Sequence, residues 1–216
     1  MSHRWTFHLS GLPGLDLANT VSWRRSAQPI ERLEGYESLV EWARQGGLVT
    51  AAEARRVERD AKRRPAAAAR VLARARALRE ALYRIFGGLA DGVAPARADL
   101  ALLDRELHEA LDHVHLIPTR GGHALAWPPD VVPLARPLWA AARSAADLLT
   151  AGNVARLKTC PSPSCGWVFL DTSKSGTRRW CAMAACGSRA KARRYYARSR
   201  SARGRSGQIP HTRRAP

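Results

Sequence analysis

Hydrophobic residues recur at helical spacing through much of the chain that precedes the first cysteine. Residues 36–45 place apolar side chains on one helical face, and Gly46 and Gly47 follow as a stop. A longer apolar stripe runs through residues 71–89, and another runs through residues 100–111. These patterns predict a mainly α-helical N-terminal region.

Polar and turn residues mark where the elements of this region begin and end. Thr50 and Glu53 have the spacing of a capping box that opens a helix, and Pro65 must end or interrupt that helix. Residues 113–127 alternate around a Gly-Gly turn, which predicts a β-hairpin. A further helix is expected to open at residues 128–130.

Some polar residues of this region allow more than one role. Asp16 and Asn19 lie in a short mixed segment, where they serve either local backbone hydrogen bonds or a pocket for a small-molecule effector. Four arginines alternate with the apolar residues of the helix that carries the 71–89 stripe, and we expect them to form a solvated face: Arg70, Arg74, Arg76 and Arg79.

The formal net charge of +18 is distributed unevenly. Lysine occurs four times against 32 arginines, an excess that a GC-rich genome produces by itself. Residues 156–216 nevertheless hold 15 lysines and arginines and one acid, Asp171, whereas residues 1–155 hold 21 bases and 17 acids. Genome composition acts on both parts alike, so the concentrated charge predicts a polyanionic partner, most often nucleic acid.

Composition also excludes several classes of protein. A hydrophobic content of 45% can build a core, which argues against a disordered chain. No window approaches eighteen uninterrupted apolar residues, and the first residues lack the pattern of a signal peptide. We therefore expect no membrane partner and a cytoplasmic location, nucleoid-associated when DNA is bound.

All four cysteines lie in one segment and carry the clearest chemistry of the chain. Cys160 and Cys165 are followed, after fifteen residues, by Cys181 and Cys186. Two such pairs in a chain without a secretory signal favour a closed tetrahedral site for one structural zinc ion. An iron–sulfur cluster and simple reduced cysteines are the alternatives, although the spacing matches neither usual ferredoxin pattern.

Secondary structure around the cysteines predicts a small ββα unit. Residues 166–171 and 177–180 are expected to form two strands joined by a turn. A helix is expected from Ser188, with Gly187 or Ser188 at its N-cap. The basic residues that we expect to contact nucleic acid lie before and along this helix: Arg178, Arg179, Arg189, Lys191, Arg193, Arg194 and Arg198.

Other candidate chemistry is weak. His113 and His115 share one face of a predicted strand, but no carboxylate or cysteine stands nearby at a ligand spacing, so we favour a structural role over a metal site. We find no nucleophile with a base at a recognisable spacing, no phosphate-binding loop and no carboxylate pair. We therefore expect no catalytic residues and no enzyme activity.

The segment GWVFLDTSKSGTRRWCAMAACGSRAKARRYYAR resembles the CGNR zinc finger, a bacterial C-terminal module, at nearly every motif position. The resemblance implies that the four cysteines bind zinc. Ser188 stands where the name-giving motif has asparagine, and a serine can still cap a helix. Residues 15–20, LDLANT, resemble the start of the ABATE domain that usually precedes this finger. The resemblance implies a bacterial transcription regulator.

These observations predict an α+β protein with three parts. Residues 1–152 form a mostly helical N-terminal domain with a small β-hairpin, which binds an effector or forms a homodimer. Residues 153–201 form the cysteine module, and residues 202–216 form a disordered basic tail.

The leading hypothesis for function is zinc-dependent DNA binding in transcription regulation. The alternative is an RNA-binding or protein-interaction module, in which the zinc element is a docking platform and Tyr195 and Tyr196 stack on unpaired bases.

Overall fold

The computed structural model describes residues 6–205, without the side chains of residues 200–205. The part of the predicted tail from residue 206 onwards lies outside the described residues. The strands are short and come in consecutive pairs between runs of helices. In chain order the elements are α1 (Pro13–Ala18), β1 (Val21–Ser22), β2 (Ile30–Glu31), α2 (Tyr36–Gln45), α3 (Ala51–Arg63), α4 (Pro65–Ala90), α5 (Arg97–Leu111), β3 (His115–Thr119), β4 (Gly122–Ala126), α6 (Arg136–Thr150), the 3₁₀ turn η1 (Asn153–Arg156), β5 (Leu157–Thr159), β6 (Val168–Leu170), the π-turn η2 (Met183–Gly187) and α7 (Ser188–Arg205).

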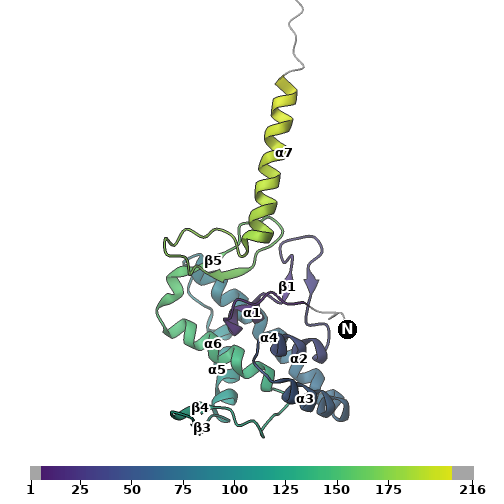
Figure 1. Cartoon of the computed structure of the whole chain (residues 1–216), viewed down its shortest axis with the longest axis vertical. Coiled ribbons are helices and arrows are strands. Elements are labelled where there is room, and N and C mark those ends of the chain that lie inside the picture. The colour runs from purple at the N-terminus through teal and green to yellow at the C-terminus, as the bar shows by residue number, and fades with distance from the viewer. Residues whose placement is uncertain (1–5, 206–216) are drawn as a thin grey trace, which may run out of the picture.

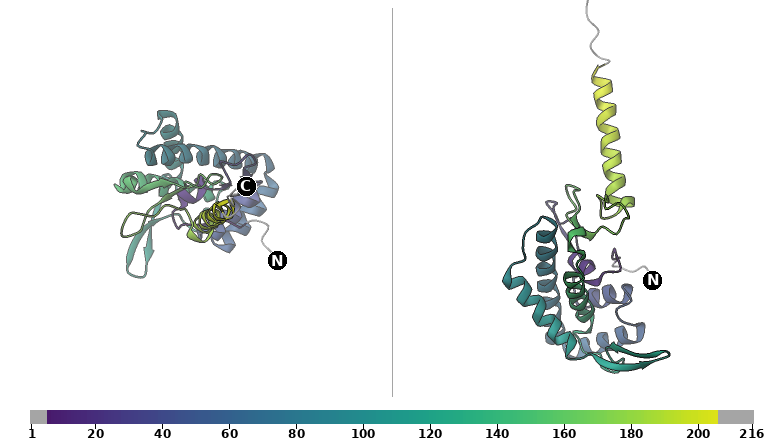
Figure 2. Two further views of the ribbon diagram at one scale, coloured as in Figure 1. Left: turned by 90° about the horizontal axis from the view of Figure 1, so that it is seen from above. Right: turned by 90° about the vertical axis from the view of Figure 1, so that its left-hand side faces the viewer.

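The helices from α1 to α6 form a rounded body, and two elements extend from it. Helix α7 projects from one end, and the hairpin of β3 and β4 lies at the other end (Figures 1 and 2). The strands form antiparallel pairs, β1 with β2, β3 with β4 and β5 with β6. Among the described residues, no helix has the length and apolar character needed to cross a bilayer.

The core of the body lies around α4, which contacts α1, α2 and α5. Short α1 is buried because it also packs against α6. A Cβ atom on Gly14 would lie 2.9 Å from the backbone nitrogen of Ala145, so only glycine allows this close approach of the two helices. Trp42 of α2 and Phe86 of α4 are among the largest buried side chains.

Several secondary-structure predictions for the N-terminal domain are confirmed. Helix α2 has the predicted bounds. At the start of α3, Glu53 donates its backbone N–H to the Thr50 hydroxyl, and Thr50 donates its own to the Glu53 carboxylate. Pro65 separates α3 from α4 and occupies the first turn of α4, where its missing N–H costs nothing. The predicted fold class, α+β with a mainly helical N-terminal domain, is confirmed.

The predicted start of α6 is wrong. The helix begins at Arg136 rather than at residues 128–130. Pro137 then lies in the first turn of the helix, which tolerates proline, whereas a start at residue 128 would have placed both Pro133 and Pro137 in its interior. The segment before α6 instead supplies buried Leu134 to the core.

The predicted solvated face of α4 is also wrong for three of its arginines. Arg79 is buried and forms an ion pair with Glu31 at 2.6 Å. Arg76 donates to the carbonyl oxygen of Leu33 at 2.6 Å, and Arg74 forms an ion pair with Glu106 of α5. These side chains connect α4 to neighbouring segments instead of facing only solvent.

Candidate metal centre and basic helix

The cysteine module begins with a hairpin that differs from the predicted one. Strand β6 pairs with β5, which precedes the first cysteine, with Lys158 opposite Phe169. Residues 177–180 form no strand, because the loop that contains them folds around the carboxylate of Asp171. This carboxylate accepts hydrogen bonds from the backbone of Arg178 at 2.9 Å and from Lys158 Nζ at 2.6 Å.

Two turns and one helix start bring the cysteines together. Cys160 follows β5 and donates its N–H to the Trp167 carbonyl at 2.8 Å, while Cys165 donates to Ser162 at 3.0 Å. Gly166 follows with a φ of +70°, a left-handed conformation that favours glycine. Cys186 lies within the π-turn η2, which leads directly into α7. Helix α7 therefore begins at Ser188, as predicted, but η2 continues directly into it. Ser188 has helical backbone angles (φ −63°, ψ −42°) instead of the extended conformation of an N-cap, so the predicted N-cap at residues 187–188 is wrong.

The four thiols form a buried cluster whose Sγ atoms all lie within 4.8 Å of one another. The distance is 3.6 Å between Cys165 and Cys181 and 3.7 Å between Cys181 and Cys186. These distances exceed a disulfide bond, and all four cysteines are free. A zinc ion with Zn–S bonds of about 2.3 Å separates tetrahedral ligands by roughly 3.8 Å. The donor set, its burial and its spacing therefore fit one structural zinc ion.

Crowding of the thiols also favours a cation at this place. A hydrogen bond from Cys165 lowers the pKa of Cys160, and the same contact raises the pKa of Cys165 to about 12. Contacts with neighbouring sulfurs, Cys160 first, raise the pKa of Cys181. Thiolates this close repel one another, so a divalent cation is needed to hold all four deprotonated.

Residues around the cluster complete the centre. Phe169 is buried against the cysteines, and Trp167 and Trp180 pack at their edge. Arg189, in the first turn of α7, places a terminal guanidinium nitrogen 3.2 Å from the Sγ of Cys186. This contact joins the first turn of α7 to the cysteine cluster.

Asp171 organises the loop between the cysteine pairs. It is fully buried and accepts further hydrogen bonds from the backbone and hydroxyl of Ser173, at 2.9 Å and 2.6 Å. Hydrogen bonds, first from Lys158, hold the pKa of Asp171 well below its usual range. Sequence reasoning missed this role, although a single acid in a segment of high positive charge was a usable sign of it.

The cysteine module packs directly on the N-terminal domain. Leu157 and Val168 belong to the same hydrophobic core as the helices of the body. The Trp167 indole donates to the Val21 carbonyl at 2.8 Å, and the Tyr83 hydroxyl donates to the Gly166 carbonyl at 2.9 Å. The two parts therefore share buried contacts instead of being joined only by a linker.

Asp16 and Asn19, the predicted effector-binding residues, both make internal hydrogen bonds. The Asn19 amide donates to the Val168 carbonyl at 2.8 Å and accepts from the Val168 N–H at 3.1 Å, which joins α1 to β6. Asp16 accepts from the backbone and hydroxyl of Ser10 and from the backbone of Gly11. Burial raises the pKa of Asp16. Both side chains also line a cavity of about 210 Å³ beside Trp167, so their predicted effector role stays a prediction.

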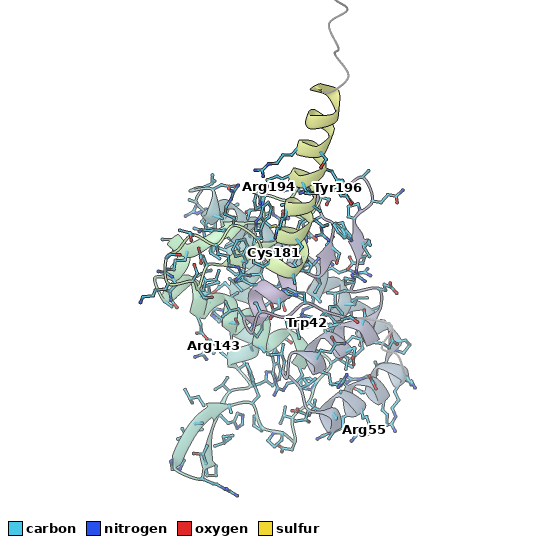
Figure 3. The ribbon with its side chains drawn as sticks, turned by 45° about the horizontal axis from the view of Figure 1, so that its top comes forward. Trp42, Arg55, Arg143, Cys181, Arg194 and Tyr196 are labelled. Carbon is cyan, nitrogen blue, oxygen red and sulfur yellow. The ribbon has the colours of Figure 1, made fainter. Side chains whose placement is uncertain are left out.

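The predicted nucleic-acid contacts fall into two groups. Arg178 lies over the Phe169 ring at 4.7 Å and donates to the Trp180 carbonyl at 2.9 Å, and Arg189 is held by Cys186 and by the Trp23 ring. The remaining five side chains are exposed: Arg179, Lys191, Arg193, Arg194 and Arg198. Arg194 and Tyr196 extend outward from α7, well away from Trp42 in the body (Figure 3).

Helix α7 continues past the predicted end of the module to Arg205. It contains eight lysines and arginines and no acid. The Ser188 hydroxyl donates to the Met183 carbonyl at 3.1 Å, so the serine at the motif's asparagine position supports the join between η2 and α7.

Comparisons with known proteins assign both parts of the chain to families. Residues 11–152 match the model of the ABATE family, described as a putative stress-induced transcription regulator. Residues 156–199 match the model of the CGNR zinc finger. A search of curated proteins gave no match.

Proposed function

Because the chain belongs to the ABATE family and carries a CGNR zinc finger, we propose that it is a transcription regulator that binds DNA through α7. The observation that supports this proposal most is the exposure of Lys191, Arg193, Arg194 and Arg198 on a helix that stands clear of the body. No acid follows Asp171 in the sequence, so nothing within this segment neutralises their charge.

The helix itself favours an anionic partner. Its 18 residues span about 27 Å, and its diameter with side chains of about 10–12 Å matches the width of the major groove of B-DNA. Like charges four residues apart, such as Arg194 and Arg198, destabilise an isolated helix. Phosphates on either side of a groove would relieve this repulsion.

The zinc centre holds the N-terminal end of α7 in place. Cys186 lies in the turn that starts the helix, and Arg189 contacts both the Cys186 sulfur and the N-terminal domain. A change in the N-terminal domain can therefore alter the direction of α7. This connection supports a regulator in which the N-terminal domain controls DNA binding.

Salt-dependent binding tests the proposal. Affinity of the zinc-loaded chain for random and genomic duplexes should fall steeply with salt, with a slope of about −4 in a log–log plot if roughly four to five phosphates are contacted. The triple variant R193A/R194A/R198A should bind at least about tenfold more weakly in fluorescence anisotropy and have a shallower slope.

A matched control separates a local contact from net charge. The triple variant R55A/R59A/R63A removes the same charge from exposed positions of α3, a helix far from α7 (Figure 1), and should retain most of the affinity. Equal losses in both variants, or an affinity indifferent to salt, would contradict binding through α7.

RNA or single-strand binding is a second candidate, favoured by one observation. Tyr195 and Tyr196 are 67% and 66% exposed, and their rings meet edge to face at 5.7 Å. Exposed aromatic rings beside arginines can stack on unpaired bases. Tighter binding to single strands than to duplexes of the same sequence, lost in Y195A/Y196A, would favour this candidate over duplex DNA.

A further inference from the structure

A cavity of about 270 Å³ lies where the N-terminal domain meets the cysteine module. Three of the cysteines border it, but most of its wall comes from other side chains. Besides Ala182 and Ala185, these come from the N-terminal arm, the β1–β2 region, the residue before β6 and the first turn of α7: His8, Ser22, Trp23, Arg32, Trp167 and Arg189. We name this space the junction cavity.

Arg32 gives the junction cavity a free positive charge. Two other arginines near this end of the N-terminal domain are paired with acids, Arg24 with Glu80 and Arg79 with Glu31. Arg32 differs: its Nε donates to the Ser22 hydroxyl at 3.0 Å, and within residues 6–205 its guanidinium forms no ion pair. A half-buried guanidinium with unused terminal N–H groups is a ready partner for an anion.

The rest of the wall is aromatic and mainly apolar. Trp23 has a φ of +56°, the left-handed conformation that a bulky side chain rarely adopts. This strained backbone turns the indole beneath the Arg189 guanidinium, 4.4 Å from the ring centroid. His8 of the arm stacks on Trp167 with ring centroids 5.5 Å apart. The cavity therefore offers flat surfaces for a planar group.

We propose that the junction cavity binds a small aromatic carboxylate, with its carboxylate on Arg32 and Ser22 and its ring against Trp23 and Trp167. A bidentate guanidinium pair suits a carboxylate. The second guanidinium of the wall, that of Arg189, already contacts the Cys186 sulfur and the Trp23 ring, so a mainly apolar wall with Arg32 open to the cavity suits a singly charged carboxylate better than a phosphate group. The volume is below that of most drug-sized sites. Nearby Asp16 already accepts three internal hydrogen bonds.

The position of the cavity connects the ligand to α7. Arg189 lies in the first turn of α7, lines the cavity and contacts the Cys186 sulfur. Its Nε is buried without a hydrogen-bond partner in the described structure. A ligand placed between Arg32 and Trp23 would therefore act on the base of the proposed DNA-binding helix. The site itself does not depend on that function.

Calorimetric titration of the zinc-loaded full chain, without nucleic acid, tests the site. The probes are benzoate and 2-naphthoate, with benzamide, 2-naphthamide, cyclohexanecarboxylate and inorganic phosphate as comparisons. The aromatic carboxylates should bind, and R32Q should weaken their binding at least about tenfold. R55Q, the same change at an exposed arginine of α3, should leave it unchanged.

Further outcomes decide the proposal without reference to DNA. R32K retains the charge but not the bidentate geometry, so it should bind the aromatic carboxylates with an affinity between those of R32Q and the parent chain. It replaces R32Q as the test variant if R32Q loses zinc or fails to fold. Equal binding of amides and carboxylates, equal affinity in R32Q or R32K and in the parent chain, or no heat with either aromatic carboxylate at millimolar concentration would overturn the proposal. Failure of DNA binding alone would leave it intact.

Discussion

Asp171 shows how one side chain can determine the shape of a loop. Its carboxylate accepts hydrogen bonds from Lys158, Ser173 and Arg178, which come from both sides of the loop. The hydrogen bond from Lys158 lowers the pKa of Asp171 in the folded protein. The ionised carboxylate therefore contributes its full stabilisation above the pKa of the unfolded chain, about 3.9, and this contribution disappears as the pH falls through the lower pKa of the folded protein.

Replacing Asp171 with asparagine should lower the stability of the zinc-loaded protein at pH 7. The change removes the negative charge that pairs with Lys158 and places an amide N–H₂ group where a hydrogen-bond acceptor is needed. We therefore expect the Tm to fall by about 5 °C or more. The loss should shrink as the pH falls below about 3.9, because the carboxyl group of the unfolded chain then takes up a proton and the folded carboxylate follows at lower pH. D147N, at an exposed position of α6, is the control, and equal Tm values for D171N and D147N by calorimetry would refute this role.

Single residues also show where sequence patterns were sufficient. The Thr50–Glu53 capping box was predictable because both partners lie within one turn. The ion pair of Arg79 with Glu31 joins residues 48 apart, and the sequence contains no rule that selects this partner. The four cysteines were predictable as a group because only their spacing mattered.

Among the elements, β5 also has a partner that the local sequence pattern did not predict. Periodicity indicated β6, but the partner strand lies before Cys160 rather than after the turn at residues 172–176. Pairing on that side becomes favourable because Leu157 and Val168 then enter the core of the body. This is a tertiary effect that the pattern of the module alone does not contain.

Zinc should be required for the fold of the cysteine module. The small cluster around the cysteines contains one buried aromatic ring, Phe169, which is too little apolar surface to hold the loops without a metal. Mass spectrometry under native conditions should find one zinc ion per chain. Chelation, or C186S, should reduce the near-ultraviolet circular dichroism of the seven tryptophans by the contribution of Trp167 and Trp180. Retention of these signals after complete zinc removal would contradict this requirement.

At the scale of the whole molecule, the two parts share one core, so we expect them to unfold together. Calorimetry of the zinc-loaded chain should show a single transition, with calorimetric and van't Hoff enthalpies in agreement. N19A removes both hydrogen bonds to the Val168 backbone and should destabilise the chain by about 1–3 kcal/mol. Two well-separated transitions in the parent chain would contradict a shared core.

The shared core has a consequence for protein engineering. A segment cut out at Asn153 would expose Leu157 and Val168 to water and leave the backbone groups of Val168 without the Asn19 amide. Its zinc centre alone would then have to support the hairpin. The zinc finger is therefore difficult to transfer to another protein. A host scaffold would have to supply the apolar surface that α1 and α4 provide here, or Leu157 and Val168 would have to be replaced by polar residues.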